Sequence, residues 1–425
     1  MKISGIITEY NPYHNGHLYH LKKTKEITGA KAVICVLNGN FMQRGTPAIT
    51  NKWTRTRMAL NCGVDLVLEL PLIYGIRSAE YFATGALTLL EKTGVVDSFV
   101  FGSESGELKP LSFAADILSK EPKYFQKRLQ HYLNQGQSFP GARQKALLDT
   151  VKKQNTQIST QKINQAVQKP NNILGIEYLK ALKNHNLSLK PITIKRIGSD
   201  YHEKNIKGEI SSATSIRKII YEKNNISIIK NLLPKKCYEL LNRDMKKGLI
   251  PIKKEKLGTM ILTKLRTISK KELKKFAELK NGLDNRIYKF ALKCGNFKEL
   301  IEKIQTRSFT NTRIQRNLLH ILFDIREKDF NTLDEYGPLY LRVLGFNNTG
   351  KKLLSKIKNK SSLPIITCPT DYLKNIKTRD PDPLIKQISY DILATDIYSL
   401  LYKKSKKRKA RGDFYHQIIT PENLL

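Results

Sequence analysis

The stretch NPYHNGH, residues 11–17, places two histidines three residues apart with a glycine between them. Three interpretations fit this pattern: contact with nucleotide phosphates, ligation of a metal ion, or a surface turn that carries histidine by chance. A metal site needs further histidine, cysteine or carboxylate partners at matched spacing, and these are missing around His14 and His17. Pro12 and Gly16 instead indicate a turn that enters a helix.

A helix start offers unpaired backbone N–H groups to an anion, and a glycine there lets the ligand approach the backbone closely. His14 and His17 would stand beside these groups and donate hydrogen bonds to phosphate oxygens. They would thereby stabilise the charge that builds up on a leaving pyrophosphate. We therefore interpret His14 and His17 as catalytic candidates.

Strand-like and helix-like segments alternate in the first third of the chain. The apolar runs KISGIITEY, KAVICVLNG, DLVLELPL and VVDSFVFGS predict buried strands of a parallel sheet covered on both faces. The fold class expected is therefore α/β, with a doubly wound parallel sheet. Ligands of such sheets bind at the carboxyl ends of the strands, and NPYHNGH follows the first of them.

The pattern predicts three regions. Residues 1–225 form the nucleotide-binding domain, with a helical insertion around 108–165; residues 226–334 form a basic helical domain; residues 335–425 form a C-terminal α+β region with a basic tail. The helix in PNNILGIEYLKALKNHN is expected to be capped by Asn171 or Asn172. PLYLRVLGFNNTGKKLLSKIKNKSSLPIIT is interpreted as a helix-turn-helix-like stretch followed by a strand.

The charge of the chain is uneven. Residues Met1 to Pro110 hold 12 Lys and Arg against 9 Asp and Glu, so +35 of the formal net charge of +38 lies beyond them. An excess of this size indicates a polyanionic partner, with nucleic acid the first candidate and an anionic membrane surface the second. The run KKSKKRKAR contains the clearest phosphate-binding candidates, although it also fits a frayed terminal tail: Lys403, Lys404, Lys406, Lys407, Arg408, Lys409 and Arg411.

The five cysteines show no CxxC spacing, which is typical of a reducing compartment. No apolar run reaches transmembrane length, and the first residues turn polar too early for a signal peptide. We expect a cytoplasmic protein without a membrane partner.

Two motifs carry a family resemblance. NPYHNGH resembles the xPxHxGH signature of HIGH-motif nucleotidyltransferases, relatives of the class I aminoacyl-tRNA synthetases. SSATSIR, residues 211–217, is similar to their S-S-T-x-[IV]-R element, in which hydroxyls, a helix N-terminus and an arginine hold the triphosphate. Further blocks, including GNFMQRGTPAI, KWTRTRMAL, FGSESG, NNILGIEYL, KRIGSDYH and LRVLGFNNTGKKLL, resemble one family over most of the chain, the tRNA(Met) cytidine acetate ligases.

This resemblance implies ATP as co-substrate together with Mg²⁺, for which the sequence identifies no protein ligands, and acetate and elongator tRNA(Met) as partners. Acetate and ATP would give acetyl-adenylate and pyrophosphate, and the acetyl group would then pass to N4 of the wobble cytidine, giving N4-acetylcytidine and AMP. The nucleotide-binding residues implied are Ile7, Thr8, Glu9, Tyr10, Asn11, Pro12, Tyr13, His14, Asn15, Gly16, His17, Leu18, Tyr19, His20, Gly102, Asn171, Asn172, Arg196, Ile197, Ser212, Thr214 and Arg217.

Weaker candidates and alternatives remain open. Gln43, Arg44 and Gly45 fit a loop that reaches phosphates or RNA, Lys52 is a further candidate, and Trp53 is expected in the core. One alternative function is a small-molecule adenylyltransferase, which leaves most of the positive charge unexplained. The other is a non-catalytic RNA-binding protein with a nucleotidyltransferase-like domain, which the intact pair of motifs disfavours.

Overall fold

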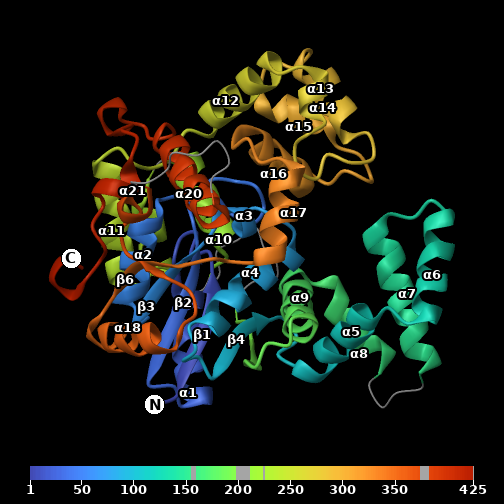
Figure 1. The fold of residues 1–425 in the computed structure, drawn as a ribbon, viewed down its shortest axis with the longest axis horizontal. Coiled ribbons are helices and arrows are strands. Elements are labelled where there is room, and N and C mark those ends of the chain that lie inside the picture. The colour runs from blue at the N-terminus through green and yellow to red at the C-terminus, as the bar shows by residue number, and fades with distance from the viewer. Residues whose placement is uncertain (155–158, 198–210, 224, 374–381, 425) are drawn as a thin grey trace.

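The computed structural model describes residues 1–154, 159–197, 211–223, 225–373 and 382–424 (Figure 1). Within these residues a sheet forms the centre of the molecule, with the strand order β5-β4-β1-β2-β3-β6-β7. The strands are β1 (Ile3–Thr8), β2 (Ala32–Asn38), β3 (Leu66–Leu70), β4 (Ser98–Ser103), β5 (Lys190–Lys195), β6 (Leu341–Phe346) and β7 (Ile365–Ile366).

The first five strands are parallel to one another. The chain builds the sheet from β1 through β2 to β3, and then returns to the other side of β1 to add β4 and β5. The direction of building therefore reverses between β1 and β4, which is where doubly wound sheets bind their ligands. The predicted α/β class is confirmed.

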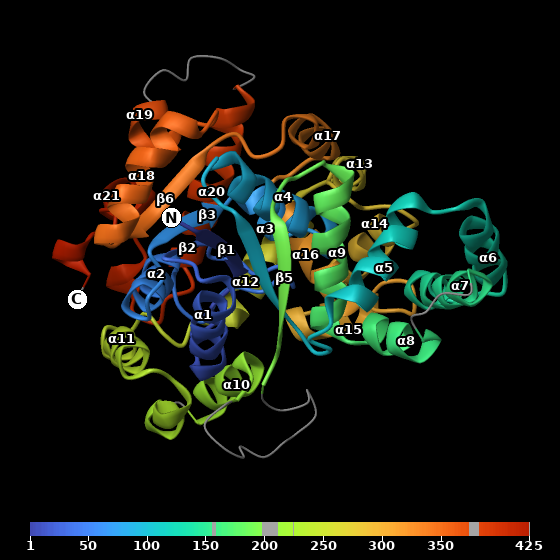
Figure 2. The same cartoon turned by 90° about the horizontal axis from the view of Figure 1, so that it is seen from below.

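Helices cover both faces of the sheet. Side chains alternate along each strand, and those on both faces are apolar and need to be buried. In β2, Ile34 and Val36 belong to a core with α3 (Leu72–Gly75) and α4 (Ala79–Lys92). Val33 and Leu37 point into a second core, which holds residues of α1 (Asn15–Thr28), α2 (Lys52–Asn61), α10 (Ala213–Lys223) and α11 (Lys235–Lys246). Figure 2 shows α1, α2, α10 and α11 on one side of the sheet and α4 on the other.

The predicted helical insertion is confirmed. It contains α5 (Leu108–Lys120), α6 (Lys123–Asn134), α7 (Phe139–Lys153) and α8 (Thr160–Gln168), and α9 (Pro170–Asn184) follows and packs on β4. Figure 1 shows α6 and α7 projecting from the body of the molecule.

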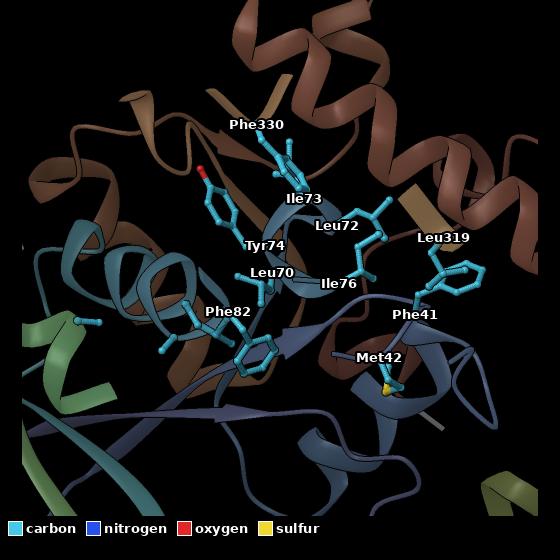
Figure 3. Packing of buried hydrophobic residues seen from close by; sticks show 14 of the residues in the cluster. Phe41, Met42, Leu70, Leu72, Ile73, Tyr74, Ile76, Phe82, Leu319 and Phe330 are labelled. Atoms are coloured by element: carbon cyan, nitrogen blue, oxygen red, sulfur yellow. The ribbon is translucent and has the colours of Figure 1, made fainter. Parts of the chain in front are cut away.

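The basic region beyond residue 225 is mostly helical, as predicted. Besides β6 and β7 it contains α-helices and short 3₁₀ helices, the latter labelled η: η1 (Ser227–Leu232), α11, α12 (Lys254–Thr267), α13 (Lys270–Leu273), α14 (Leu283–Ala291), α15 (Phe297–Ile304), α16 (Asn311–Leu322), α17 (Glu327–Tyr336), α18 (Asn348–Lys360), α19 (Thr370–Leu373), α20 (Pro383–Ser399), η2 (Ser405–Lys407), α21 (Gly412–Tyr415) and η3 (Pro421–Asn423). Figure 3 shows Leu319 and Phe330 of α16 and α17 packed near the apolar side chains that follow β3. No described helix is both long and apolar enough to cross a membrane.

The helix-turn-helix interpretation of residues 338–367 is wrong. The segment folds as strand β6, helix α18 and strand β7, and β6 lies antiparallel beside β3 with Val343 opposite Leu68. Leu341 and Val343 pack into one core and Leu344 into the other, so β6 is apolar on both faces. A short strand of this kind cannot be told from a buried helix by periodicity alone. The domain boundaries near 225 and 335 stay predictions.

One buried arginine holds the loops at the carboxyl ends of β1 and β2. Arg55 of α2 is completely buried, and its guanidinium donates to the backbone carbonyls of Glu9 and Asn38 at 2.8 Å each and of Thr50 at 3.1 Å. It also donates to the carbonyl of Gly39. Burial lowers the pKa of Arg55 to about 10, which still leaves the group charged at neutral pH. Four backbone carbonyls, three of them in buried hydrogen bonds, are thus satisfied by one side chain.

Lys52 is buried in an ion cluster and is not exposed to a ligand. Its ammonium lies 2.8 Å from the Glu69 carboxylate and 2.7 Å from that of Asp413. Burial acts to lower the pKa of Lys52, but these two carboxylates outweigh it and raise the pKa. The cluster fastens the C-terminal segment around α21 to α2 and β3.

The buried arginine leads to a stability prediction. We expect Arg55→Ala to destabilise the protein by at least about 3 kcal/mol, because several buried carbonyls lose their donor at about 1–3 kcal/mol each. Urea unfolding compared with Arg307→Ala, which removes an exposed guanidinium, measures the effect. Equal unfolding midpoints for the two variants would contradict this role.

Candidate active site

The histidine motif folds as the start of α1. His14 is the N-cap residue and only 4% exposed; its Nδ1 accepts a hydrogen bond from the Gly16 N–H at 3.1 Å. The His17 Nδ1 accepts in turn from the His14 N–H at 3.2 Å, and the two rings stack with centroids 3.8 Å apart. Two histidines therefore form the reciprocal capping arrangement that serine and glutamate usually provide.

Burial keeps these rings neutral. It lowers the pKa of His14 to about 3, helped by the nearby charges of Arg196 and Arg217. Burial also lowers the pKa of His17 well below its usual value, with smaller contributions from His14 and Arg196. For His20, burial and Arg196 lower the pKa to about 4. The Nε2 atom of His20 is buried and has no hydrogen-bond partner within the described part of the chain.

The SSATSIR motif is in direct contact with the NPYHNGH turn. Arg217 on α10 donates to the carbonyl of Asn11 at 2.7 Å and to the Thr214 hydroxyl at 3.1 Å. The hydroxyl oxygen of Ser212 accepts from the Ser215 N–H at 3.1 Å, so it lies at the start of the helix. Residues 206 positions apart in sequence are thus in direct contact.

Gly102 and Arg196 stand at the carboxyl ends of β4 and β5. The Arg196 N–H donates to the Ser103 carbonyl at 2.9 Å. A Cβ atom on Gly102 would lie 3.2 Å from Arg196 Cγ and 3.7 Å from His20 Cδ2, so glycine lets these side chains come close. Ile197 follows and is 52% exposed. The rest of the KRIGSDYH block, residues 198–202, lies outside the described residues.

Neither asparagine of the 171–172 pair is the N-cap of α9, which corrects the sequence prediction. The helix begins at Pro170 after Lys169, and the Glu104 carboxylate accepts from the backbone N–H groups of Asn171 at 3.2 Å and Asn172 at 2.8 Å. The Asn172 side chain is buried, and its oxygen accepts from the Glu104 N–H at 2.8 Å. These reciprocal hydrogen bonds fix the loop after β4 against the start of α9.

The remaining residues of the 7–20 stretch lie on three elements. Ile7 and Thr8 end β1, Glu9 to Tyr13 form the turn, and Asn15 to His20 open α1. Several already have protein partners: Glu9 accepts from the Gln43 N–H at 2.7 Å, and Asn11 Oδ1 accepts from the Ile49 N–H at 2.7 Å. Tyr10 and Tyr13 are buried, and the ring of Tyr10 meets that of His17 edge-on at 4.9 Å.

The loop GNFMQRG lies beside this turn. Besides its backbone bond to Glu9, Gln43 donates from its side chain to the Arg77 carbonyl at 2.9 Å. A Cβ on Gly45 would come within 2.6 Å of the Arg316 backbone, so this end of the loop lies against α16. Trp53 is 7% exposed and stacks on His416, in agreement with the expectation of core packing.

The basic run 403–411 is anchored at both ends. Arg408 donates to the Tyr402 carbonyl at 2.9 Å, and the Arg411 N–H donates to Asp396 at 2.6 Å. Gly412 and Asp413, which follow, are buried. The frayed-tail alternative therefore does not fit, and most cations of the run are exposed on a short turn.

Sequence reasoning missed Arg55 and Glu104. Arg55 donates to backbone carbonyls beside the histidine motif, and Glu104 accepts from the backbone of the asparagine pair. Neither residue stands out in the sequence by its type or by its distance from the motifs. Among the described residues, no group of three or more His, Cys, Asp or Glu side chains could hold a metal ion.

Comparison with known proteins adds independent findings. The model of the family described as HIGH Nucleotidyl Transferase matches residues 1–413. A tRNA(Met) cytidine acetate ligase of Halothermothrix orenii is 51% identical over 420 residues, with 99% of each chain covered. One of Acetivibrio thermocellus is 45% identical over 424 residues, which cover 99% of this chain and 100% of the relative.

Solved structures show the same family similarity. The crystal structure of Thermotoga maritima TmcAL bound with alpha-thio ATP is 34% identical, with a TM-score of 0.91 and 99% of each chain covered. The apo form of the same protein gives a TM-score of 0.93 at 35% identity, again over 99% of each chain. With 51% identity to a relative along 99% of both chains, and with the motifs at residues 11–17 and 211–217 in contact at one edge of the sheet, this chain belongs to the tRNA(Met) cytidine acetate ligase family.

Proposed function

We propose that this chain is an ATP-dependent ligase that acetylates N4 of the wobble cytidine of elongator tRNA(Met). Acetate and ATP give acetyl-adenylate and pyrophosphate, and acetyl transfer to the tRNA gives N4-acetylcytidine and AMP. The observation that carries this proposal is the contact between the Arg217 guanidinium and the Asn11 carbonyl, which joins the two phosphate motifs. The relatives named tRNA(Met) cytidine acetate ligase support the choice of substrates.

The first step needs positioning and charge stabilisation more than covalent help. A carboxylate oxygen of acetate attacks the α-phosphorus, and the bond from that phosphorus to the pyrophosphate oxygen breaks. Because the Nδ1 atoms of His14 and His17 both accept backbone N–H groups, the neutral rings carry their proton on Nε2. Each Nε2–H then donates to the phosphates as negative charge moves to pyrophosphate.

The second motif holds the other side of the triphosphate. Arg217 supplies charge, and the Ser212 and Thr214 hydroxyls and the first N–H groups of α10 supply hydrogen bonds. Arg196 lies close enough to lower the pKa of all three histidines and adds a further positive charge.

We assign the loops at the ends of β4 and β5 to binding the adenosine part of ATP. Gly102 gives the nucleotide access to the backbone after β4, and Ile197 offers an exposed apolar surface. Of the two asparagines, Asn171 is the better contact. The Asn172 side chain is buried and its oxygen accepts from two backbone N–H groups. The Asn171 side chain is partly exposed and its oxygen stays open to the nucleotide, although its amide donates to the Glu104 carboxylate at 2.7 Å.

In the second step the N4 amine of cytidine attacks the acetyl carbonyl carbon. The bond from that carbon to the phosphate oxygen breaks, AMP leaves, and the amine loses a proton. The basic region beyond residue 225 and the run 403–411 bind the tRNA backbone. We place this activity in the cytoplasm.

We expect Mg²⁺ to enter with ATP, with its ligands largely from phosphate and water. The described residues offer no carboxylate cluster for it, so no protein ligand is assigned and no step depends on it.

A reaction with labelled acetate, ATP and total tRNA tests the function. Nucleoside mass spectrometry after digestion should find acetylcytidine only when all three components are present. Transfer of AMP to a small phosphate ester in place of acetylcytidine would favour the adenylyltransferase alternative. Salt-sensitive RNA binding without turnover would favour the non-catalytic alternative.

Substitution of the histidines separates chemistry from RNA binding. We expect His14→Ala and His17→Ala to lower acetate-dependent ATP–pyrophosphate exchange by at least about 100-fold, because a donor to the developing charge is lost. Their affinity for tRNA should change less than about 2-fold, since the basic surfaces remain. His185→Ala, on an exposed residue, is the control for both measurements. Loss of tRNA binding in the histidine variants would contradict this division.

The tautomer assignment gives a pH prediction for the ligand-free protein. A pKa of about 3 for His14 and about 4 for His20 keeps both rings neutral as the pH falls through 6.5, where histidines of the unfolded chain gain a proton. Ring ¹⁵N signals should stay constant from pH 8 to 5.5, with the proton of His14 and His17 on Nε2. A midpoint near pH 6.5, or a proton on Nδ1, would rule the assignment out.

A further inference from the structure

Five lysines lie between the nucleotide site and the basic run 403–411. We call them the lysine strip: Lys246, Lys247, Lys253, Lys254 and Lys256. They occur within eleven residues that link the end of α11 to the start of α12, together with one acidic residue, Glu255. Four of the five side chains are exposed and Lys256 is partly exposed.

Backbone hydrogen bonds join this link to the basic run. The Lys404 N–H donates to the Gly248 carbonyl at 3.0 Å, and the Lys253 N–H donates to the Leu401 carbonyl at 2.9 Å. A Cβ on Gly248 would lie 2.8 Å from Lys404 Cβ, so the two segments are in close contact. Cations that lie about 150 residues apart in sequence therefore share one surface.

The other end of the strip reaches the nucleotide site. The Lys254 ammonium lies 4.1 Å from the centroid of the Tyr221 ring. Tyr221 follows Arg217 by four residues on α10, so the two side chains stand one turn apart on the same helix face. Arg217 is the residue that contacts the histidine turn. The strip thus runs from the proposed triphosphate site to the basic run.

Two lysines of the strip are repelled by nearby cations. Partial burial of the ammonium group lowers the pKa of Lys254, and the charge of Arg217 lowers it further. The pKa of Lys256 is also lowered, first by partial burial and then by Arg408 and Lys253. Among the described residues, none of Lys253, Lys254 and Lys256 has a carboxylate within the 4 Å of an ion pair, and Glu255 offsets the strip only in part. A polyanion laid along the strip would relieve this repulsion.

We propose that the lysine strip is the path of the tRNA backbone from the basic run to the acetyl-adenylate, and that Lys254 contacts a phosphate beside the acceptor cytidine. This inference rests on the proposed function. An RNA single strand fits better than a membrane surface, because the strip ends at the arginine that lines the nucleotide site, where a flexible chain can enter and a bilayer cannot.

The test compares two triple variants with equal loss of charge. The strip variant is Lys253→Ala, Lys254→Ala and Lys256→Ala; the control is Lys270→Ala, Lys271→Ala and Lys274→Ala, on exposed residues at the far end of α12. Figure 1 shows α13 at that end, away from α10. Fluorescence anisotropy with unmodified tRNA(Met) over a series of NaCl concentrations measures the affinity and its salt slope.

We expect the strip variant to bind tRNA at least about 10-fold more weakly and to lower the salt slope by roughly 2, since each phosphate contact contributes about 0.7–0.9. The control variant should change affinity less than about 2-fold. Acetate-dependent ATP–pyrophosphate exchange without tRNA should equal that of the unmodified protein in both variants. Lys254→Arg, which keeps the charge, should restore most of the acetyl transfer that Lys254→Ala loses.

Three outcomes would overturn the proposal. Equal loss of tRNA affinity in strip and control variants would show that the strip contributes only general surface charge and no defined tRNA path. Loss of pyrophosphate exchange in Lys254→Ala would show that this lysine acts in ATP binding or acetate activation and not in tRNA binding. Unchanged tRNA binding with lost binding to phosphatidylserine vesicles would assign the strip to a membrane. If the unmodified protein makes no acetylcytidine, the proposed function fails separately, because the tRNA-binding comparison does not depend on turnover.

Discussion

The reversal of strand order between β1 and β4 is the constraint on which the site depends. All five parallel strands end at one edge, but only at this position do the connections from two neighbouring strands leave in opposite directions. The histidine turn follows one of these strands and Gly102 lies at the end of the other. The chain then returns through β5 and reaches the start of α10, which brings Arg217 to the Asn11 carbonyl. Strand order thus joins motifs that sequence separates.

A second physical feature is the division of charge between histidines and arginines around the proposed phosphate site. Arg196 and Arg217 add positive charge while burial keeps His14 and His17 neutral. In the proposed function, these neutral imidazoles donate Nε2–H hydrogen bonds to the phosphates and transfer no proton. The permanent charges come from arginine, whose high pKa keeps it charged at any physiological pH.

Much of this arrangement was predictable because strand patterns and glycine-rich turns are local signals. NPYHNGH and SSATSIR carry their chemistry in residue type and spacing, so His14, His17 and Arg217 could be named before the fold was known. Glu104 and Arg55 act on backbone groups far away in sequence, and nothing local marks an acid or an arginine for that task. β6 was misread because it is apolar on both faces, and the lysine strip appears only when α11, α12 and the basic run are seen together.

The central claim is that acetate is activated on the α-phosphate of ATP before the acetyl group reaches RNA. Acetate labelled with ¹⁸O in both oxygens tests it directly, because one labelled oxygen forms the bridge of acetyl-adenylate and stays with AMP when the amine takes the acetyl carbon. Mass spectrometry should find one ¹⁸O in AMP for each acetylcytidine formed. Acetylcytidine accompanied by unlabelled AMP would contradict the account.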